Sequence, residues 1–418
     1  MRILYLHQFF KTREEAGGTR SYELARHLVR SGHEVVILTA AAAPSPALRT
    51  VDGIQVVKVG GASPDYAAAT ARGYGSRMAG FARFAAAATA AALRTAPPDV
   101  VLATSPPLTI ALPAVAAAKR HRAPLVFEVR DLWPEAPIQM GALPNPLAQR
   151  AARAAERAVY RCASHVVALS PGMRDGVVAA GVEPGRVTLV PNASDLDLFS
   201  PDLDPGDLRE RLDLEGKFVC SYFGTMGEAN DLTQVVEAAS LLADRGENGV
   251  AFVLQGAGKR RGAIEEEVDR RKLSNVVLLP AGPKAGAARL AAASDACMTI
   301  FKDVPILATN SPNKLFDTFA AGRAAIVNTG GWQRELVERH QAGVYTRGGD
   351  PAHLAEQVLW LRDHPAETAA YGRNARHLAE TQFDRRMLAE RMRVVLEEAA
   401  SPEAQPPSKG AGPDAPRR

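Results

Sequence analysis

The chain has 418 residues, of which 46% are apolar and 23% charged, a balance typical of folded globular proteins and not of disordered ones. Its length is sufficient for two or three domains. The 50 basic and 46 acidic residues leave a formal charge of only +4. Because the basic residues are interspersed and form no long block, binding to nucleic acid is not indicated.

Cysteine usage and the lengths of apolar runs indicate the compartment. The three cysteines, Cys162, Cys220 and Cys297, are widely spaced and form no paired-ligand pattern, which favours a reduced, cytosolic chain without a metal site. Polar side chains interrupt the N-terminal stretch, and no segment approaches the ~20 apolar residues of a spanning helix. We therefore expect a cytoplasmic protein that is neither exported nor membrane-spanning.

Short apolar runs of strand length recur in two series, with helical stretches between them. The first series is Ile3–Leu6, Val35–Leu38, Val100–Ala103, Leu125–Val129, Val166–Leu169 and Val187–Val190. The second is Phe218–Tyr222, Ala251–Leu254, Val276–Leu279, Ala296–Ile300 and Ala325–Val327. Such alternation predicts buried parallel sheets. Two series predict two doubly wound α/β domains.

Two segments break the alternation. Residues 191–207 contain several prolines and aspartates that interrupt any regular period, so we place the linker between the domains there. Residues 401–418 are rich in Pro and Gly and lack an apolar period. We expect this tail to be disordered, because it cannot bury enough apolar surface.

The most informative segment is TNSPNKLFDTFAAG, residues 309–322. The Ser-Pro-Asn run 311–313 reads as a helix start, where unpaired backbone N–H groups and a partial positive charge favour an anion. Lys314 would add a point charge beside a bound diphosphate. Asp317 lies one turn further on, within reach of a hydroxyl attached to that phosphate. The segment therefore predicts a nucleotide-sugar site.

This segment resembles the donor-binding signature of the retaining glycosyltransferases of family 4, especially the branch with an SPNK-(L/I)-F-(D/E) run. The usual signature has two acidic residues with seven between them. Asp317 matches the second acid, which the resemblance implies binds the ribose, but Thr309 stands at the position of the first. The resemblance implies that the first acid helps to stabilise the reacting sugar, and Thr309 has no carboxylate for this role.

Two further segments carry the resemblance. Residues 191–199 resemble the P-N-G-x-D-x-x-x-F junction of family 4, with Ala193 in place of the usual Gly, and residues 130–134 read RDLWP. The resemblance runs from Met1 to about Glu398 and implies the GT-B fold, two Rossmann-like domains with a cleft between them. The implied domains are acceptor-binding 1–200, donor-binding 201–385, a returning C-terminal helix 386–400, and the disordered tail 401–418.

Several candidate residues follow predicted strands, at the sheet edge where open α/β folds bind ligands. His7 ends strand one, and the Gly17-Gly18 pair after it would line the cleft or simply form a tight turn. Glu128, Arg130 and Asp131 follow another strand. Many relatives have His-Asp where this chain has Arg130-Asp131, so Arg130 would instead contact the donor phosphate or an anionic acceptor. A surface Arg-Asp pair is the simpler alternative.

Glycine loops follow two strands of the second series. Gly224-Thr225 resembles the loop that approaches the nucleotide phosphates, since glycine permits close backbone approach. Gly256 and Gly258 precede Lys259 and Arg260 and superficially suggest a dinucleotide fingerprint. The glycine spacing is one residue too long and no acid follows the next strand, so a dehydrogenase is disfavoured.

These residues are assigned to three roles. We expect catalytic roles for Lys314, Arg130, Asp131 and Lys259. The expected acceptor-binding residues are His7, Gly17, Gly18 and Glu128. The expected donor-binding residues are Gly224, Thr225, Gly256, Gly258, Arg260, Ser311, Asn313, Leu315 and Asp317.

The resemblance implies a hexosyltransferase that moves a sugar, of amino-sugar or deoxy-sugar type, from a nucleoside diphosphate donor to an acceptor hydroxyl, with retention and without a metal or other cofactor. UDP is the expected nucleotide, and a glycoside or lipid-linked sugar the expected acceptor, in bacterial polysaccharide or natural-product pathways. Two alternatives stay open: an NDP-sugar epimerase on the same architecture, and a non-catalytic nucleotide-binding protein.

A basic, partly aromatic segment near Arg72 to Phe84 has rough helical spacing. One face of such a helix would lie on an anionic membrane, making the protein peripheral at the inner face of the cell membrane. Core packing with exposed arginines is at least as favoured.

Overall fold

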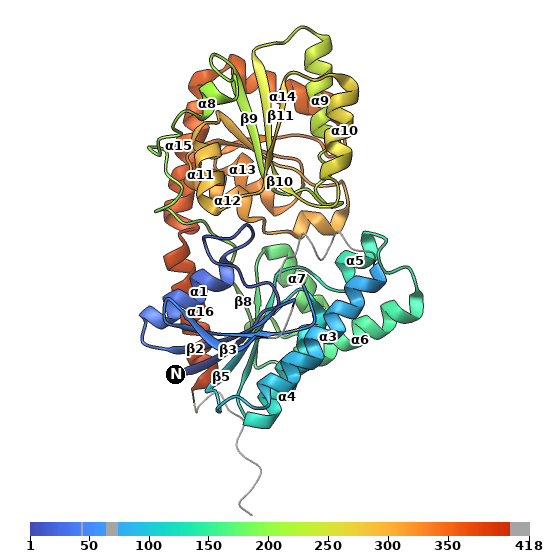
Figure 1. Ribbon diagram of the computed structural model, residues 1–418, viewed down its shortest axis with the longest axis vertical. Helices are drawn as coiled ribbons and strands as arrows, with labels where there is room; N and C mark the ends of the chain where they lie inside the picture. The colour runs from blue at the N-terminus through green and yellow to red at the C-terminus, as the bar shows by residue number, and fades with distance from the viewer. Residues whose placement is uncertain (43–44, 64–73, 402–418) are drawn as a thin grey trace, which may run out of the picture.

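A computed structural model describes residues 1–42, 45–63 and 74–401. These residues form two α/β domains stacked along the long axis of the molecule, which confirms the predicted GT-B type of fold (Figure 1). The predicted disordered tail lies outside the described residues except for Ser401, and so does Arg72 of the basic segment.

The N-terminal sheet has the strand order β3-β4-β2-β1-β5-β6-β7-β8 within the described part of the chain. All neighbours pair in parallel except β3 and β4. The strands are β1 Arg2–Leu6, β2 Glu34–Ala40, β3 Ser45–Val51, β4 Ile54–Val59, β5 Val100–Ser105, β6 Leu125–Val129, β7 His165–Ala168 and β8 Val187–Leu189.

Helices cover both faces of this sheet, which is why β5 and β6 are buried along their whole length. The N-terminal helices are α1 Arg20–Arg30, α3 Tyr74–Ala92, α4 Ala111–His121, α5 Glu135–Gln139, α6 Pro146–Cys162 and α7 Pro171–Ala179. Side chains of α1 and of the C-terminal helix α16 (Arg385–Ala400) pack on one face. Side chains of α3, α4, α6 and α7 pack on the other.

The C-terminal sheet is parallel, with the order β11-β10-β9-β12-β13-β14 among the described residues. Its strands are β9 Phe218–Thr225, β10 Val250–Ala257, β11 Val276–Pro280, β12 Ala296–Thr299, β13 Ala324–Val327 and β14 Gly343–Tyr345. Its helices are α8 Leu208–Arg211, α9 Thr233–Asp244, α10 Arg261–Arg271, α11 Lys284–Ala292, α12 Asn313–Ala320, α13 Trp332–Arg339, α14 Pro351–Asp363 and α15 Pro365–Gln382.

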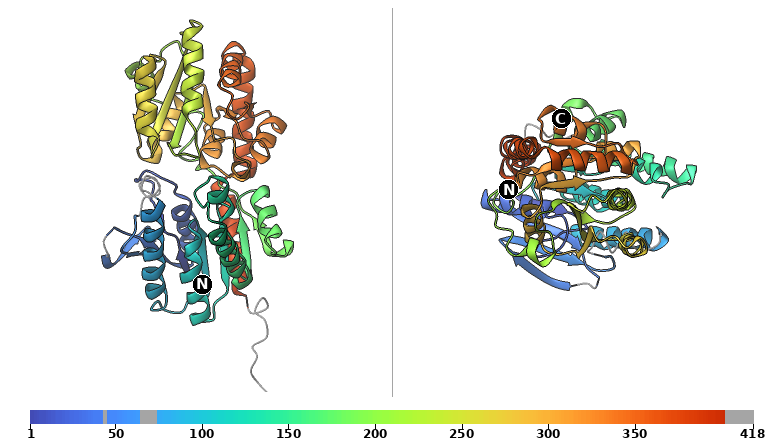
Figure 2. Two further views of the ribbon diagram at one scale, coloured as in Figure 1. Left: turned by 90° about the vertical axis from the view of Figure 1, so that its right-hand side faces the viewer. Right: turned by 90° about the horizontal axis from the view of Figure 1, so that it is seen from above.

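The chain crosses between the domains twice, and the two crossings lie side by side. The first crossing follows β8, and the second leads from α15 into α16, which runs down against α1 of the N-terminal domain (Figures 1 and 2). A parallel bridge between Ser194 and Asp384 joins the two crossings. Nε2 of His27 in α1 and Nε2 of His33 just after it each lie 3.1 Å from a carboxylate oxygen of α16, on Glu390 and Glu397 respectively.

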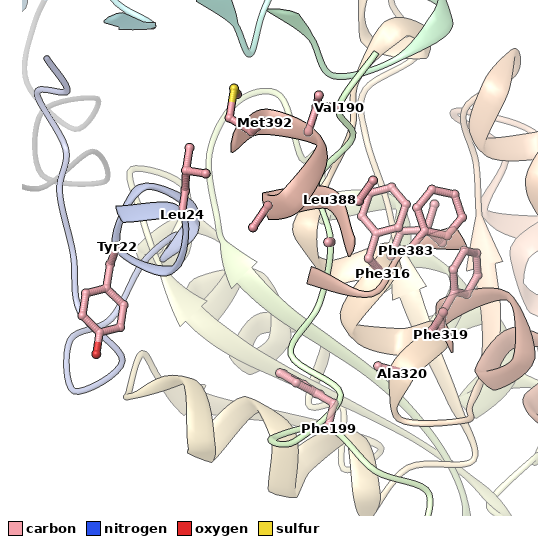
Figure 3. Close-up of a cluster of buried hydrophobic side chains, with 14 of the residues drawn as sticks. Tyr22, Leu24, Val190, Phe199, Phe316, Phe319, Ala320, Phe383, Leu388 and Met392 are labelled. Carbon is pink, nitrogen blue, oxygen red and sulfur yellow. The ribbon is translucent and has the colours of Figure 1, made fainter. Parts of the chain in front are cut away.

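An aromatic cluster next to these crossings anchors α12. Figure 3 shows Phe316 and Phe319 of α12 beside Phe383, which precedes α16. The ring centres of Phe316 and Phe383 lie 4.6 Å apart, and all three rings are buried. This packing fixes the axis of α12, so that its first residues point out of the core.

Strands β3, β4 and β14 were not predicted. β4 alternates buried and half-buried positions instead of forming an apolar run, β3 is antiparallel and contains Pro46, and β14 has only three residues. Each is too short or too polar to give the pattern of a buried parallel strand.

The aromatic side chains of the basic segment pack inward. Phe81 and Phe84 are buried, and the Phe81 ring lies edge-on to Trp133 at 6.3 Å. Arg83 Nε donates to the Gly61 carbonyl at 3.0 Å. For Phe81 and Phe84, core packing is therefore the correct reading. No helix of the described chain is long and apolar enough to cross a membrane.

Candidate functional site

Lys314, at the second residue of α12, is half-buried and has no acidic partner among the described residues. Its Nζ donates to the Tyr222 hydroxyl at 3.0 Å and lies 4.4 Å from the Tyr222 ring centre and 5.2 Å from that of Phe301. Burial lowers the pKa of Lys314 to about 7. Rings and a hydroxyl stabilise an ammonium less than an anion would.

The glycine loops at the ends of β9 and β10 pack against each other and against Lys314. A methyl group on Gly224 would lie 3.1 Å from Lys314 Cε. Methyl groups on Gly256 and Gly258 would lie only 1.9 Å from the Gly224 carbonyl oxygen and 2.4 Å from that of Met226. Gly256 and Gly258 are therefore needed because the backbones of the two loops touch at these positions. The sequence pattern did not reveal this reason.

The start of α12 also meets the N-terminal domain. Asn192 of the linker donates from its backbone N to Ser311 Oγ at 3.1 Å and from Nδ2 to the Ser311 carbonyl at 2.5 Å. A methyl group on Gly18 would lie 3.5 Å from Asn313 Nδ2 and 3.8 Å from Arg130 Nη2. The Gly17-Gly18 loop, the end of β6 and the start of α12 thus converge at one place between the domains.

Asn313 and the first turn of α12 offer unused polar atoms at this place. Asn313 Oδ1 is buried and has no hydrogen-bond partner within the described ranges. The side chain of Leu315, by contrast, is fully buried in the core. Because this side chain packs in the core, it holds α12 in place, and only the backbone of Leu315 is available to a ligand.

Asp317 faces inward from α12 and meets a lysine that sequence reasoning missed. Asp317 Oδ1 lies 3.3 Å from Lys284 Nζ, and the same Nζ donates to Asp195 Oδ2 at 2.9 Å. Burial raises the pKa of Asp317 to about 6, although Lys284 opposes that shift. Asp195 lies within the PN-x-x-D-x-x-x-F junction, but no local signal in the sequence points to Lys284.

The N-terminal side of the cleft holds His7, Arg130 and Asp131. His7 is buried, and its pKa is well below the ordinary value because of burial and, secondly, the charge of Arg130. His7 Nδ1 lies 2.8 Å from Ser21 Oγ, and Arg130 Nη1 donates to Nε2 at 3.4 Å. Asp131 is half-buried, and burial raises its pKa to about 6. A neutral imidazole and a partly protonated carboxyl therefore flank a guanidinium.

Glu128 does not face the cleft, so the expected acceptor contact through its side chain is wrong. It lies within β6, its side chain is fully buried, and Oε1 accepts from Arg20 Nε at 3.0 Å and Nη2 at 2.8 Å. Thr104 Oγ1 donates to Oε2 at 2.8 Å. Arg20 also donates to the carbonyls of Val190 and Pro191. The pair ties α1 to the start of the linker.

Lys259 and Arg260 lie at the surface, beyond Gly258. Lys259 Nζ is 3.0 Å from Glu228 Oε1, and Arg260 Nε is 3.9 Å from Oε2. About half of each of these side chains is exposed. Thr225, on the neighbouring loop, accepts a hydrogen bond from the Tyr222 hydroxyl through its carbonyl at 2.6 Å.

Thr309 lies at the contact between the domains. Its hydroxyl donates to the Ile306 carbonyl at 2.7 Å, while Ser170 Oγ, at the start of α7, donates to the Thr309 carbonyl. A methyl group on Gly172 would lie 3.0 Å from Thr309 Cγ2. Thr309 thus packs against α7. Across the described ranges, no cluster of three or more His, Cys, Asp or Glu is suited to hold a metal ion.

Comparison with known families accounts for both domains. Residues 16–193 match the family described as glycosyl transferase 4-like domain, and residues 217–364 match the glycosyl transferases group 1 family. Each of the two domains thus matches a glycosyltransferase domain family, which supports a glycosyltransferase, and the two-domain fold is of the GT-B type.

Individual relatives agree with this assignment. WcaI of Escherichia coli (strain K12), named as a colanic acid biosynthesis glycosyl transferase, is 27% identical over 236 residues, which are 55% of this chain and 57% of WcaI. The match thus spans little more than half the length of that relative. Sucrose-phosphate synthase from Thermosynechococcus elongatus is 17% identical, with a TM-score of 0.78 over 96% of this chain and 100% of the other. HepE from Anabaena, solved with UDP and glucose, is 18% identical, with a TM-score of 0.71 over 95% and 100%.

Proposed function

We propose that the protein transfers a sugar from a UDP-sugar to an acceptor hydroxyl, with retention of configuration at the anomeric carbon. The observation that carries the proposal is the Lys314 amino group, which lies against the Tyr222 and Phe301 rings and which no carboxylate in the described part of the chain neutralises. A buried cation is costly unless an anion pairs with it. A diphosphate at the start of α12 would supply that anion.

The chemistry proposed for this side of the cleft is stabilisation of the leaving group. As the bond to the sugar breaks, negative charge grows on the diphosphate, and Lys314 with the first amides of α12 would stabilise it more than the ground state. Lys259 and Arg260 now pair with Glu228. On donor binding they would leave Glu228 and pair with the phosphate. Asp317 would accept from the ribose, and Ser311 and Asn313 would position the turn.

Acceptor binding is proposed for the opposite side, where Gly17, Gly18 and His7 lie near Arg130. Because its pKa is lowered, His7 would contact the sugar as a neutral hydrogen-bonding group. Arg130 would contact the donor phosphate or an anionic acceptor. In the same-face mechanism that we propose, an oxygen of the leaving phosphate takes the acceptor proton, so no carboxylate nucleophile is required.

The proposed donor is a UDP-linked hexose, of amino-sugar or deoxy-sugar type, and the acceptor a glycoside or lipid-linked sugar of a polysaccharide or natural-product pathway. HepE, which shares the fold, was solved with UDP, and this supports the choice of nucleotide. Because Lys314, protonated when the diphosphate binds, and the first amides of α12 would stabilise the diphosphate charge, we propose that transfer requires no metal.

A thermal-shift panel with UDP, GDP, dTDP, ADP and NADP tests the donor assignment, since a ligand that binds only the native state raises the melting temperature. We expect UDP to give the largest shift. The same panel on Lys314→Met should give no UDP shift, while the matched control Lys302→Met, an exposed lysine, should respond like the wild type. A response to NADP alone would contradict the proposal.

Product analysis separates transfer from the two alternatives. A transferase converts a UDP-sugar only when an acceptor is supplied, and NMR of the product would show a retained anomeric configuration. An epimerase would change the free UDP-sugar without an acceptor. The packing of Thr309, which has no carboxylate, is the observation that favours a non-catalytic protein. Such a protein would bind UDP but form no product with any acceptor.

A further inference from the structure

Lys284 occupies a buried position between two carboxylates from different parts of the chain. Its Nζ donates to Asp195 Oδ2 at 2.9 Å and lies 3.3 Å from Asp317 Oδ1. Only 9% of the Lys284 side chain is exposed, with 2% for Asp195 and 7% for Asp317. The Nζ also lies 5.4 Å from the Phe199 ring centre. Three residues of the linker and α12 thus fix one ammonium.

The two carboxylates depend on Lys284 to different extents. Asp195 has other cations: Arg385 Nε donates to Oδ1, and Arg13 Nη2 lies 3.4 Å from the same oxygen. The pKa of Asp195 is held well below its usual range by Arg385 and Lys284 against the effect of burial. Asp317 Oδ1 has no hydrogen-bond partner within the described ranges and lies 3.3 Å from Lys284 Nζ in an ion pair; burial raises the Asp317 pKa.

We propose that Lys284 is a positioning residue for the donor ribose: it holds the Asp317 carboxylate in place, and Asp195 holds Lys284. This inference rests on the proposed function, because it takes Asp317 as the group that accepts from the ribose hydroxyls. Lys284 engages Oδ1 and thereby leaves Oδ2 for the ligand. Asp195 adds a link from the donor site to the linker, and Arg13 and Arg385 extend the link to the N-terminal domain and α16.

The charges explain why a lysine is suited to this position. An ammonium has three donors on a flexible stem, so it can serve two carboxylates from different directions. Without it, Asp195 and Asp317 would be two buried acids that face each other, and Asp317 would be the one to take up a proton, since Asp195 keeps two guanidinium partners. A neutral Asp317 is a poorer acceptor for ribose hydroxyls.

Lys284→Met removes the charge and keeps the aliphatic stem beside Phe199. Calorimetric titration with UDP and with 2′,3′-dideoxyuridine diphosphate, on wild type and variant, separates the ribose contribution from that of the phosphates. We expect wild type to prefer UDP, and Lys284→Met to lose about tenfold or more of its UDP affinity, with little change for the dideoxy nucleotide. Asp317→Asn should lose the same preference, and the double variant should lose no more than either single variant.

The outcomes distinguish this inference from the function on which it rests. If wild type binds neither nucleotide, the proposed function fails. If wild type prefers UDP and Lys284→Met keeps the full preference, the positioning role is overturned. If Lys284 had a purely structural role, Lys284→Met would lower the melting temperature and weaken the affinity for both nucleotides equally, which would also overturn the positioning role. Should Lys284→Met fail to fold, Lys284→Gln, which keeps polar donors but removes the positive charge, is interpreted in the same way.

Discussion

Lys314 Nζ lies 3.0 Å from the Tyr222 hydroxyl oxygen and 4.4 Å from the centre of the Tyr222 ring. The hydroxyl in turn donates to the Thr225 carbonyl, at the end of β9. The ammonium is therefore fixed by groups that carry no full negative charge. In the absence of a ligand, keeping the charged ammonium in this site lowers the stability of the folded protein. A bound anion would remove that free-energy penalty.

Lys314→Met should separate stability from activity. At pH 7 the unfolded chain carries a fully protonated lysine, but burial lowers the pKa in the folded protein to about 7; since the unfolded state binds more protons, folding pays for burying this group. We expect the melting temperature of the ligand-free variant to equal or exceed that of wild type. Turnover should fall about 10²-fold or more, as when a transition-state donor is removed.

Calorimetry and initial rates check both parts of this prediction, and Lys302→Met controls for the loss of one positive charge. A lower melting temperature with normal turnover would mean that Lys314 is a structural cation and not a diphosphate ligand.

The affinity for UDP should depend on pH through the same lysine. A diphosphate favours the charged ammonium and so raises the Lys314 pKa from about 7 in the free protein. UDP binding then takes up a proton above pH 7, and the association constant should fall by up to about tenfold per pH unit as pH rises from 7 to 9. Titrations in two buffers of different ionisation enthalpy measure the uptake. In Lys314→Met the slope should vanish; an unchanged slope would assign the proton elsewhere.

Most of the fold could be predicted from the sequence because its central strands are buried on both faces and read as apolar runs. The motif around Lys314 and Asp317 was readable for a similar reason, since its residues are adjacent in the chain. Lys284 was not, because its partner Asp195 is 89 residues away and no periodic pattern links them. The sequence pattern predicted Tyr222 only as a core strand residue, although its ring and hydroxyl both contact Lys314.

The glycines of the second loop should be required for folding more than for ligand contact. A methyl group on Gly256 would lie 1.9 Å from the Gly224 carbonyl oxygen, a distance that only a backbone shift can relieve. We expect Gly256→Ala to cost about 3 kcal/mol or more. Gly262→Ala is the matched control: it lies in α10 with open space around it and should be neutral or stabilise by about 0.5 kcal/mol.

Thermal unfolding of these two variants decides between the readings. If Gly256→Ala kept the wild-type melting temperature but lost UDP binding, the glycine would be required for the nucleotide and not for the contact between β9 and β10.

Glu128→Gln should lower stability and leave the acceptor site intact. The substitution keeps the volume but leaves the buried Arg20 guanidinium without its carboxylate, and breaking one side of a buried pair costs about 3–5 kcal/mol. Glu135→Gln breaks a half-exposed pair with Arg153 and should cost less than about 1 kcal/mol. Calorimetry compares the two melting temperatures, and initial rates give the acceptor KM. A raised acceptor KM in Glu128→Gln at an unchanged melting temperature would mean that Glu128 contacts the acceptor. A lowered melting temperature with a normal KM would mean that Glu128 acts by tying α1 to the linker.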